Sequence, residues 1–318
     1  MIQNRIPLTI ALMAYDHVYE IRARDNDYEI RSGAVEIAGV DPTFVDLPSP
    51  HAFAAFADQE DWAVSDVPLA EYLQRRLAGD TTITALPIFT SRMFTHRCVF
   101  VRRDRIKEPA DLRGARVGVG AQNLTECVYA RGMLADMYGI GAADVTWVNE
   151  PERQLGALLA AGEVDAVIAP AHVLSLGTVA GSRNMGPLFE QPGVAERAYL
   201  AKTRVFPVVR ALAVRTELLK QHRWLASNIY RAFEVARRRY FARLDDIRGS
   251  RVPIPAVDGH MRTVREAFGG DFWPYGIADN RATLETFVRY AAEQGLIEPA
   301  DVKLEALFAR IEPFVDKY

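Results

Sequence analysis

The sequence predicts an α/β protein of two lobes, with mixed, mainly parallel sheets flanked by helices. The chain has 318 residues, more than one hydrophobic core usually supports. Apolar residues make up 49% and charged residues 25% of the chain, which is ordinary for a globular protein. Between residues 115 and 170, short apolar strands alternate with helical segments, a pattern typical of a parallel sheet whose two faces are covered.

The alternation is clearest in the middle of the chain. Gly139 and Gly162 each stand where a helical pattern stops, because glycine readily adopts the left-handed conformation that closes a helix. The predicted order is strand 115–119, helix 125–138, strand 145–148, helix 153–161 and strand 164–169.

Shorter strands and longer helices flank this region. The other predicted strands are residues 8–13, 62–65, 82–86 and 207–214. In residues 225–244, apolar side chains recur at helical spacing, and the adjacent run Arg237-Arg238-Arg239 is expected to form a solvated face. The last helix is predicted to begin near Asp279 or Asn280, as an N-cap, and to stop at Gly295.

Composition narrows the classes of function. A formal net charge of -3 gives no electrostatic reason to expect nucleic acid or an anionic membrane as a partner. Cys98 and Cys127 are the two cysteines, too few for a disulfide framework. The apolar stretch 6–14 is short and lacks a cleavage site for a leader. We therefore expect a cytoplasmic protein that acts on a small molecule; a homo-oligomer is compatible with the sequence.

Two segments combine polar groups with bulky aromatics. They are Ser91-Arg92-Met93-Phe94-Thr95-His96 and Asp271-Phe272-Trp273-Pro274-Tyr275-Gly276. Polar heads on apolar bodies are typical of the walls of a ligand cavity. Arginine suits a carboxylate because its guanidinium binds in a bidentate manner.

With these segments in view, the chain resembles the 4,5-dihydroxyphthalate decarboxylase family along most of its length. Two further motifs, Asp111-Leu112-Arg113-Gly114 and Gly162-Glu163-Val164-Asp165-Ala166, also look like those of periplasmic solute-binding proteins of the type 2 fold. The remaining matching residues are Leu86-Pro87-Ile88-Phe89, Arg131-Gly132, Phe206-Pro207 and Asn280-Arg281.

The resemblance implies a type 2 periplasmic-binding-protein-like, or Venus-flytrap, architecture. Lobe I would comprise residues 1–101 and 206–318, lobe II residues 102–205, and the ligand would bind in the cleft between them. The implied reaction is the non-oxidative removal of one carboxylate from 4,5-dihydroxyphthalate, or a close analogue, to give protocatechuate. Two positions depart from the family pattern: His17 stands where relatives carry arginine, and Arg210 stands where they carry histidine.

Decarboxylation of an electron-rich ring requires groups that bind carboxylates, a donor that protonates the ring carbon and an acceptor for the phenol proton. Histidine suits both proton roles because its reference pKa lies near neutrality. The candidate catalytic residues are His96, His17 and Asp66. The candidate substrate-binding residues are Arg92, Ser91, Asp16, Thr125, Asn123, His172, Arg204, Arg210, Trp273 and Tyr275.

Other classes of function remain open from the residues alone. A non-catalytic protein of the same fold would bind an aromatic or other organic anion. Gly118 and Gly120 after a strand match a dinucleotide fingerprint weakly. No cofactor is required by the proposed chemistry, but His17, Asp16, Asp66 and His96 could also gather around a divalent metal.

Overall fold

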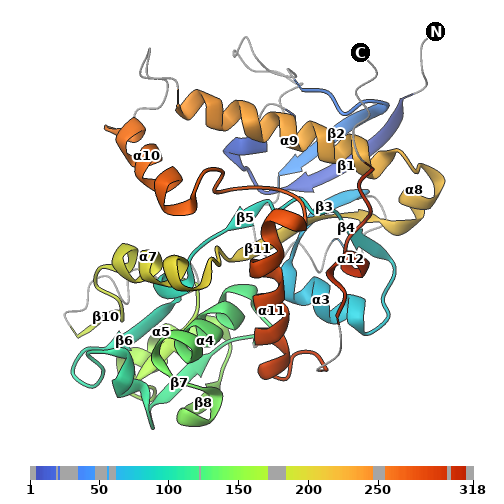
Figure 1. The fold of residues 1–318 in the computed structure, drawn as a ribbon. Coiled ribbons are helices and arrows are strands. Elements are labelled where there is room, and N and C mark those ends of the chain that lie inside the picture. Colours follow the sequence, from blue (N-terminus) through green and yellow to red (C-terminus); the bar gives the residue numbers. More distant parts are fainter. Residues whose placement is uncertain are drawn as a thin grey trace.

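The computed structural model describes residues 5–18, 21, 35–46, 56, 62–121, 123–170, 184–245, 255–298 and 302–312. Within these residues the chain forms two mixed sheets flanked by helices, the first in the upper half of Figure 1 and the second in the lower half. The two-lobed α/β class predicted from the sequence is therefore confirmed.

The first sheet has the strand order β2-β1-β3-β11-β4, and β5 also pairs with β11. β1 runs parallel to β2 and β3, whereas β11 runs antiparallel to β3, β4 and β5. Two of the five strand pairings are parallel, so this sheet is mixed, as predicted, but not mainly parallel. The strands are β1 (Ile6–Leu12), β2 (Val40–Asp46), β3 (Val64–Pro68), β4 (Ile83–Ala85), β5 (Ser91–Arg92) and β11 (Val208–Arg215).

The second sheet has the order β10-β6-β9-β7-β8. β7 is parallel to both β8 and β9, as the alternation in the sequence predicts, whereas β6 is antiparallel to β9 and β10. The strands are β6 (Val99–Arg102), β7 (Arg116–Val119), β8 (Thr146–Asn149), β9 (Ala166–Ile168) and β10 (Met185–Pro187).

The chain passes between the two sheets at two places. It leaves the first sheet after β5, runs through the 3-10 turn η2 (Thr95–Cys98) and enters the second sheet at β6. It returns through α7 (Pro192–Thr203) and joins the first sheet at β11. Because β5 pairs directly with β11, the outgoing and returning segments lie side by side, and we call this part of the molecule the hinge.

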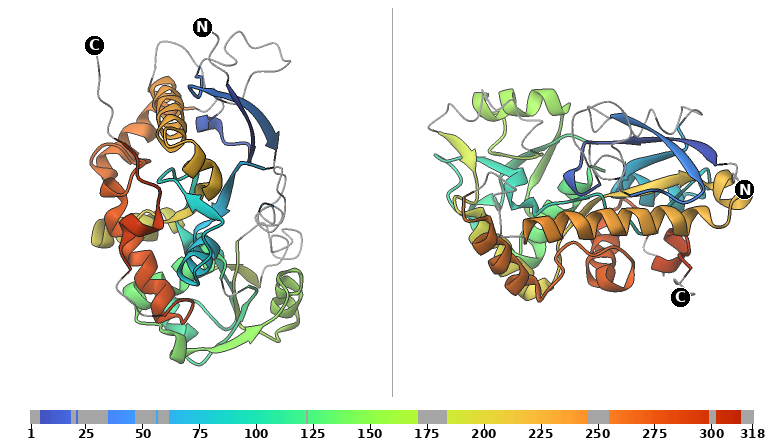
Figure 2. Two further views of the ribbon diagram at one scale, coloured as in Figure 1. Left: turned by 90° about the vertical axis from the view of Figure 1, so that its right-hand side faces the viewer. Right: turned by 90° about the horizontal axis from the view of Figure 1, so that it is seen from above.

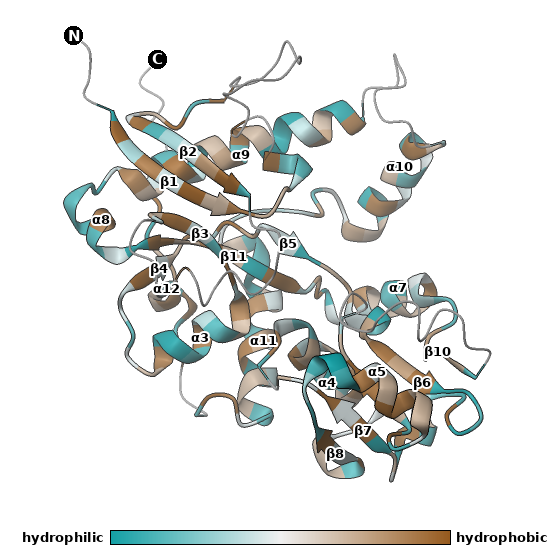
Figure 3. Ribbon diagram, turned by 180° about the vertical axis from the view of Figure 1, so that it is seen from behind, coloured by the Kyte–Doolittle hydropathy of each residue, from teal (hydrophilic) through white to brown (hydrophobic). Residues whose placement is uncertain are grey.

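Helices cover both sheets, and two views at right angles to Figure 1 show how they are layered (Figure 2). The helices are α3 (Leu69–Leu77), α4 (Thr125–Tyr138), α5 (Glu152–Ala161), α8 (Thr216–Gln221), α9 (Leu225–Leu244), α10 (Val257–Phe268), α11 (Arg281–Glu293) and α12 (Leu304–Leu307). Single 3-10 turns are η1 (Asp16–Val18), η3 (Pro109–Leu112), η4 (Ala142–Asp144) and η5 (Ala278–Asn280). Coloured by hydropathy, β1 and β6 are mostly hydrophobic, whereas the short surface helix α8 is mostly hydrophilic (Figure 3).

Helix α9 covers one face of the first sheet with the apolar stripe that the sequence predicts. Leu225, Ile229 and Phe233 are completely buried in a cluster with residues of β1, β3 and β11. Arg237, however, is also buried. The expectation of a solvated Arg237-Arg238-Arg239 face is wrong at this position, because Arg237 lies one helical turn after Phe233 and so falls on the buried stripe.

Helix α11 packs on α4, which belongs to the second sheet's half of the molecule. The Tyr129 and Phe287 rings lie 4.8 Å apart, and the Tyr290 hydroxyl donates to Asp136 over 2.6 Å. Arg289 forms an ion pair with the same aspartate. Residues of both halves therefore share one apolar cluster, so burial of α11 holds the halves together.

Local predictions hold best where a side chain or glycine sets the backbone directly. Gly139 and Gly162 close α4 and α5 with left-handed φ values of 65° and 76°. Asn280 does occupy the N-cap position of α11, but its side chain makes no capping bond. Its amide instead donates to the carbonyls of Pro274 and Gly276.

The two glycines that suggested a dinucleotide site serve packing. A Cβ on Gly118, inside β7, would approach the Leu155 side chain at 3.2 Å. A Cβ on Gly120 would meet the Glu152 side chain at 2.3 Å. Both glycines allow α5 to lie close to β7, which explains their presence without a phosphate.

We expect Gly132→Ala to destabilise the protein, because a Cβ there would stand 2.3 Å from the Tyr290 ring. Overpacking of this kind costs about 1 to 3 kcal/mol. The matched control is Gly156→Ala in α5, where nothing lies within 4 Å of an added Cβ; it should be neutral or stabilising by up to about 1 kcal/mol. Denaturant unfolding of both variants measures the difference, and equal effects would contradict the close contact between α4 and α11.

Candidate active site

The most distinctive polar group in the described residues is a buried cluster around Asp66 in β3. Its Oδ2 accepts one hydrogen bond from the Tyr15 hydroxyl and one from Arg210 Nε, each of 2.7 Å. Arg210 Nη2 also donates to the Asp66 carbonyl over 3.2 Å. The antiparallel register of β3 and β11 produces this pairing, because it sets Asp66 opposite Leu212 and Arg210 opposite Pro68. We call Tyr15, Asp66 and Arg210 the Asp66 cluster.

Burial makes each member of the cluster depend on the others. The Asp66 side chain has no exposed surface and that of Arg210 is 6% exposed. Burial raises the pKa of Tyr15, and the Asp66 carboxylate raises it further, so the phenol stays protonated and donates. For Arg210, burial lowers the pKa, but the Asp66 carboxylate more than offsets this and the net shift is upward. Removing one partner of such a buried ion pair strongly destabilises the folded protein, because the other charge is left buried and unpaired.

The second carboxylate oxygen of Asp66 differs from the first. Oδ1 is buried and has no hydrogen-bond partner among the described residues. Leaving such an acceptor unsatisfied costs about 1 to 3 kcal/mol. A hydroxyl group of a bound molecule would satisfy it, and an ionised carboxylate could also take up the proton of that hydroxyl.

His17 lies beside the cluster in the turn η1, which packs against α9. Its ring centroid is 5.5 Å from that of Tyr15 and 5.4 Å from that of Trp273. Burial lowers the pKa of His17 to about 4, and the positive charges of Arg237 and Arg92 add to this effect. The imidazole is therefore neutral near pH 7, and its buried Nε2 has no partner within the described ranges.

Arg92 forms a clamp across the hinge. Its Nη1 donates to the Phe206 carbonyl over 3.2 Å and its Nη2 to the Pro274 carbonyl over 2.8 Å. Nη2 also donates to Asn280 Oδ1. The side chain thereby ties β5 to the returning segment and to the start of α11, a structural task that its place in the sequence did not reveal.

Residues 271–276 contact segments that are distant from them in the sequence. The Trp273 indole donates to the Phe89 carbonyl over 3.0 Å, and its ring stands 5.8 Å from that of Phe206. Tyr275 is buried, and the Arg237 guanidinium lies 5.3 Å from its ring centroid. Arg237 also holds Asp271 with two hydrogen bonds, of 3.0 and 2.8 Å. Sequence reasoning missed Arg237, and the helical spacing from Phe233 is the signal that could have found it.

His96 occupies a different environment. It is 1% exposed, and its ring packs against Phe94, Phe189 and Tyr199 at centroid distances of 6.4, 5.1 and 5.6 Å. Neither ring nitrogen has a partner among the described residues. Burial lowers the pKa of His96 to about 4, and Glu196 opposes the shift only in part. None of these ring contacts involves the Asp66 cluster.

The remaining candidates lie at different depths. Ser91 pairs with Arg210 across β5 and β11 and so borders the Asp66 cluster. Thr125 is buried at the start of α4, and its Oγ1 accepts a 3.0 Å hydrogen bond from the backbone N–H of Ala70 at the start of α3. That bond links the two halves of the molecule. Asn123 is half-buried, Asp16 and Arg204 are exposed, and His172 lies outside the described residues.

The described residues contain no group of three or more His, Cys, Asp or Glu side chains arranged to hold a metal ion. The arrangement of His17, Asp16, Asp66 and His96 around a metal therefore finds no support in this geometry. In the same part of the chain, no helix is long and apolar enough to cross a membrane.

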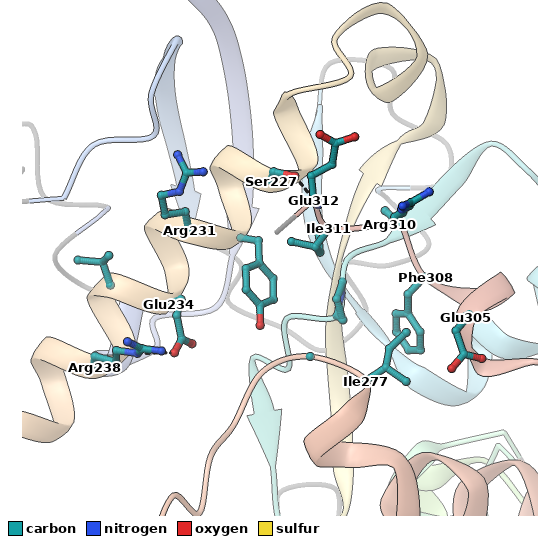
Figure 4. Close-up of a pocket in the computed structure, with 15 residues that line it drawn as sticks. Ser227, Arg231, Glu234, Arg238, Ile277, Glu305, Phe308, Arg310, Ile311 and Glu312 are labelled. Atoms are coloured by element: carbon teal, nitrogen blue, oxygen red, sulfur yellow. Dashed lines mark hydrogen bonds and ion pairs between the residues drawn. The ribbon is translucent and has the colours of Figure 1, made fainter. Parts of the chain in front are cut away.

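Among the cavities lined by described residues, two differ in their relation to the predicted site. The larger, of about 880 Å³, opens between α9 and residues 305–312 and contains no predicted site residue (Figure 4). Its walls include Tyr230, Ile277 and Phe308, with charged side chains at the rim. The second, of about 500 Å³, is lined by Arg92, Arg204, Phe206, Phe268, Asn280 and residues near them. Because it lies against the hinge segment, we call it the hinge pocket.

Comparisons with known proteins agree with this architecture. Residues 73–238 match the family model described as NMT1/THI5 like. A periplasmic sulfonate-binding protein from Methylobacillus flagellatus has a TM-score of 0.55 at 13% identity, covering 97% of this chain and 92% of that one. The desulfurization enzyme DSZB has a TM-score of 0.50 at 17% identity, covering 92% and 93%. These structures share the fold, which occurs in both a binding protein and an enzyme.

Two curated relatives are more specific. The 4,5-dihydroxyphthalate decarboxylase of Comamonas testosteroni is 32% identical over 331 aligned positions, covering 94% of this chain and 96% of the relative. The enzyme of the same name from Pseudomonas putida is 35% identical over 198 positions, covering 54% and 72%. The chain thus has the fold of NMT1/THI5-like proteins. Within that class, it belongs to the 4,5-dihydroxyphthalate decarboxylase family.

The buried histidines predict a loss of stability in acid. An unfolded histidine has a pKa near 6.5, whereas the folded pKa of His96 is about 4, so below pH 6.5 the unfolded state binds more protons. The free energy of unfolding is therefore highest above pH 6.5 and decreases as the pH falls toward 4. Between pH 7 and pH 5 each such histidine lowers it by about 2 kcal/mol. His96→Phe should reduce this pH dependence by that amount. Urea unfolding at both pH values measures it, and an unchanged dependence would show that His96 titrates normally.

Proposed function

We propose that the protein is a carboxy-lyase that removes one carboxylate from a hydroxylated aromatic dicarboxylate of the 4,5-dihydroxyphthalate type. The product would be a dihydroxybenzoate such as protocatechuate. Membership of the decarboxylase family supports the class of reaction. The single structural observation that carries the proposal is the buried Asp66 carboxylate, which has one oxygen fully engaged and one without a partner.

The proposed role of Asp66 follows from this asymmetry. Tyr15 and Arg210 hold Oδ2 and fix the direction of the carboxylate. Oδ1 would accept a hydrogen bond from a ring hydroxyl of the substrate. Withdrawing that proton increases the electron density at the para carbon, which carries the carboxylate that leaves. Arg210 forms an ion pair with Asp66. Its positive charge therefore orients this base, and substrate binding is not its only role.

The ring carbon must then receive a proton before its bond to the carboxylate breaks and carbon dioxide departs. Because His17 is neutral near pH 7, it can deliver a proton only after accepting one. We infer that His17 takes the proton of the ring hydroxyl, directly or through Asp66, and passes it to the ring carbon. Solvent then returns a proton to the phenolate of the product, which balances the reaction.

His17 is a better candidate than His96 for this transfer. The His17 ring lies next to that of Tyr15, whose hydroxyl donates a hydrogen bond to Asp66. The ring neighbours of His96 are Phe94, Phe189 and Tyr199, none of which belongs to the Asp66 cluster. Ser91 borders the Asp66 cluster through its pairing with Arg210. Thr125 lies between the two halves of the molecule. Their hydroxyl groups suit the binding of the substrate's carboxylates.

The direct test is to mix the purified, chelator-treated protein with 4,5-dihydroxyphthalate and to measure carbon dioxide release and the aromatic product by chromatography. We expect stoichiometric carbon dioxide and dihydroxybenzoate. A parallel series with added divalent metals shows whether the reaction needs an ion. Tight binding without product in either series would instead identify a non-catalytic binding protein of the same fold.

Asp66→Asn should lower kcat by about 10²-fold or more, because it removes the proton acceptor while keeping the shape of the side chain. His17→Gln should have a similar effect, and His96→Phe should leave kcat within a few-fold of the wild type. Asp258→Asn, an exposed position in α10, is the matched control for loss of a carboxylate. Steady-state kinetics of the four variants decides the roles; a large kcat loss confined to His96→Phe would transfer the proton role to His96.

A further inference from the structure

The hinge pocket is lined by two arginines that lack an acidic partner. Arg92 is 7% exposed and forms no ion pair within the described residues, and its Nε has no hydrogen-bond partner there. The oxygen atoms that it contacts are two backbone carbonyls and the amide of Asn280. The Phe89, Phe206 and Trp273 rings also lie 5.3 to 5.8 Å from its guanidinium carbon. Burying a cation among neutral groups alone is unfavourable, so an anion next to Arg92 would stabilise it.

Arg204 also lines this pocket, at the end of α7. It is exposed, and its side chain has no ion pair or hydrogen bond among the described residues. Its backbone adopts a left-handed φ of 59°, a conformation that costs a non-glycine residue about 1 to 2 kcal/mol. The pocket thus has a second free guanidinium, held at a strained position where glycine or asparagine would be more stable.

The acidic residues of the pocket are largely neutralised elsewhere. Asp271 accepts two hydrogen bonds from Arg237, and Glu285 pairs with Arg281. Asp279 also lines the pocket, but it borders a neighbouring cavity with Tyr230 as well. The N-terminus of α11 opens on the pocket with the partial positive charge of its helix dipole. The local balance therefore favours an anion.

The remaining walls of the pocket are aromatic. Phe206 and Phe268 lie 5.2 Å apart in an edge-to-face contact, and Phe272 lies 6.0 Å from Phe268. A cavity of about 500 Å³ has ample space for one aromatic ring with a carboxylate. Two free cations beside such walls define the chemistry of the ligand: a charged head and a flat apolar body.

We propose that the hinge pocket is a second ligand site, which binds a small aromatic carboxylate with its anionic group between Arg92 and Arg204. The site is separate from the Asp66 cluster and does not depend on the proposed function. Trp273 connects the two places, since its ring lies 5.8 Å from that of Phe206 and 5.4 Å from that of His17. A ligand that binds Arg92 therefore contacts the side chain that links β5 to Phe206 and to the start of α11.

The test uses benzoate as the probe and isothermal titration calorimetry of the full-length protein at constant ionic strength. Wild-type protein should bind benzoate, and Arg204→Asn should weaken binding by at least tenfold. Because asparagine tolerates the left-handed conformation, this variant should keep or raise the Tm, so loss of binding could not be attributed to unfolding. Arg197→Gln removes a positive charge from the exposed face of the same helix, outside the pocket, and should bind benzoate as the wild type does.

Four outcomes would overturn the proposal. They are no binding by the wild type up to about 10 mM benzoate, unchanged binding by Arg204→Asn, equal weakening by Arg197→Gln, and equally strong binding of the neutral analogue benzamide. Binding that Asp66→Asn abolishes while Arg204→Asn preserves it would assign benzoate to the Asp66 cluster instead. The titration involves no turnover, so its result stands whether or not carbon dioxide is released from 4,5-dihydroxyphthalate.

Discussion

The ion pair between Asp66 and Arg210 is the constraint on which the candidate site depends. Two opposite charges are buried in the first sheet, on neighbouring strands that run in opposite directions. Their attraction offsets the cost of removing both from water only if the geometry is good and the remaining polar atoms are satisfied. Tyr15 supplies one of the missing bonds, and a ligand hydroxyl is the natural partner for the oxygen that is left. The same pairing that stabilises the sheet thus prepares a base for chemistry.

The hinge imposes a second constraint, because the chain crosses it twice. Arg92 connects the outgoing strand β5 to the returning residue Phe206 and to the segment before α11. Helix α11 then packs on α4 and adds an ion pair and a tyrosine hydrogen bond to Asp136. The C-terminal region therefore couples the two halves, and movement of one half against the other must be accommodated around these contacts.

The predicted site residues separate into three environments. His17, Asp66, Arg210 and Ser91 gather around the interior strands β3 and β11 of the first sheet, whereas Arg92 and Arg204 line the hinge pocket. His96 lies in a third environment, where its ring packs against Phe189 and Tyr199 and has no ring contact with either of the other two groups. A protein with the fold of both binding proteins and an enzyme can carry more than one ligand site, because each site requires only a few side chains on a shared scaffold.

The sequence by itself determined the features that local chemistry controls. Alternating apolar segments predicted the central strands and helices, and Gly139 and Gly162 marked helix ends because only glycine reaches the left-handed region without strain. The two aromatic segments, together with the family resemblance, pointed to the fold; of the candidate site residues, Arg92, Arg204 and Tyr275 line a cavity in the described part of the chain. His17 and Asp66 were candidates from the sequence, although Asp66 lies within β3 and not after the predicted strand 62–65.

Tertiary structure alone decided which of these residues meet. Asp66 and Arg210 are 144 positions apart in the chain, and only the strand order places them side by side. Arg237 was expected in solvent; its spacing from Phe233 places it on the buried stripe of α9, but its partners Asp271 and Tyr275 come from a distant segment. Asn280 looked like a helix cap, yet its side chain serves Arg92 and two carbonyls. Local patterns set helices and strands, whereas partners of buried charges are fixed by long-range packing, which no short stretch of sequence contains.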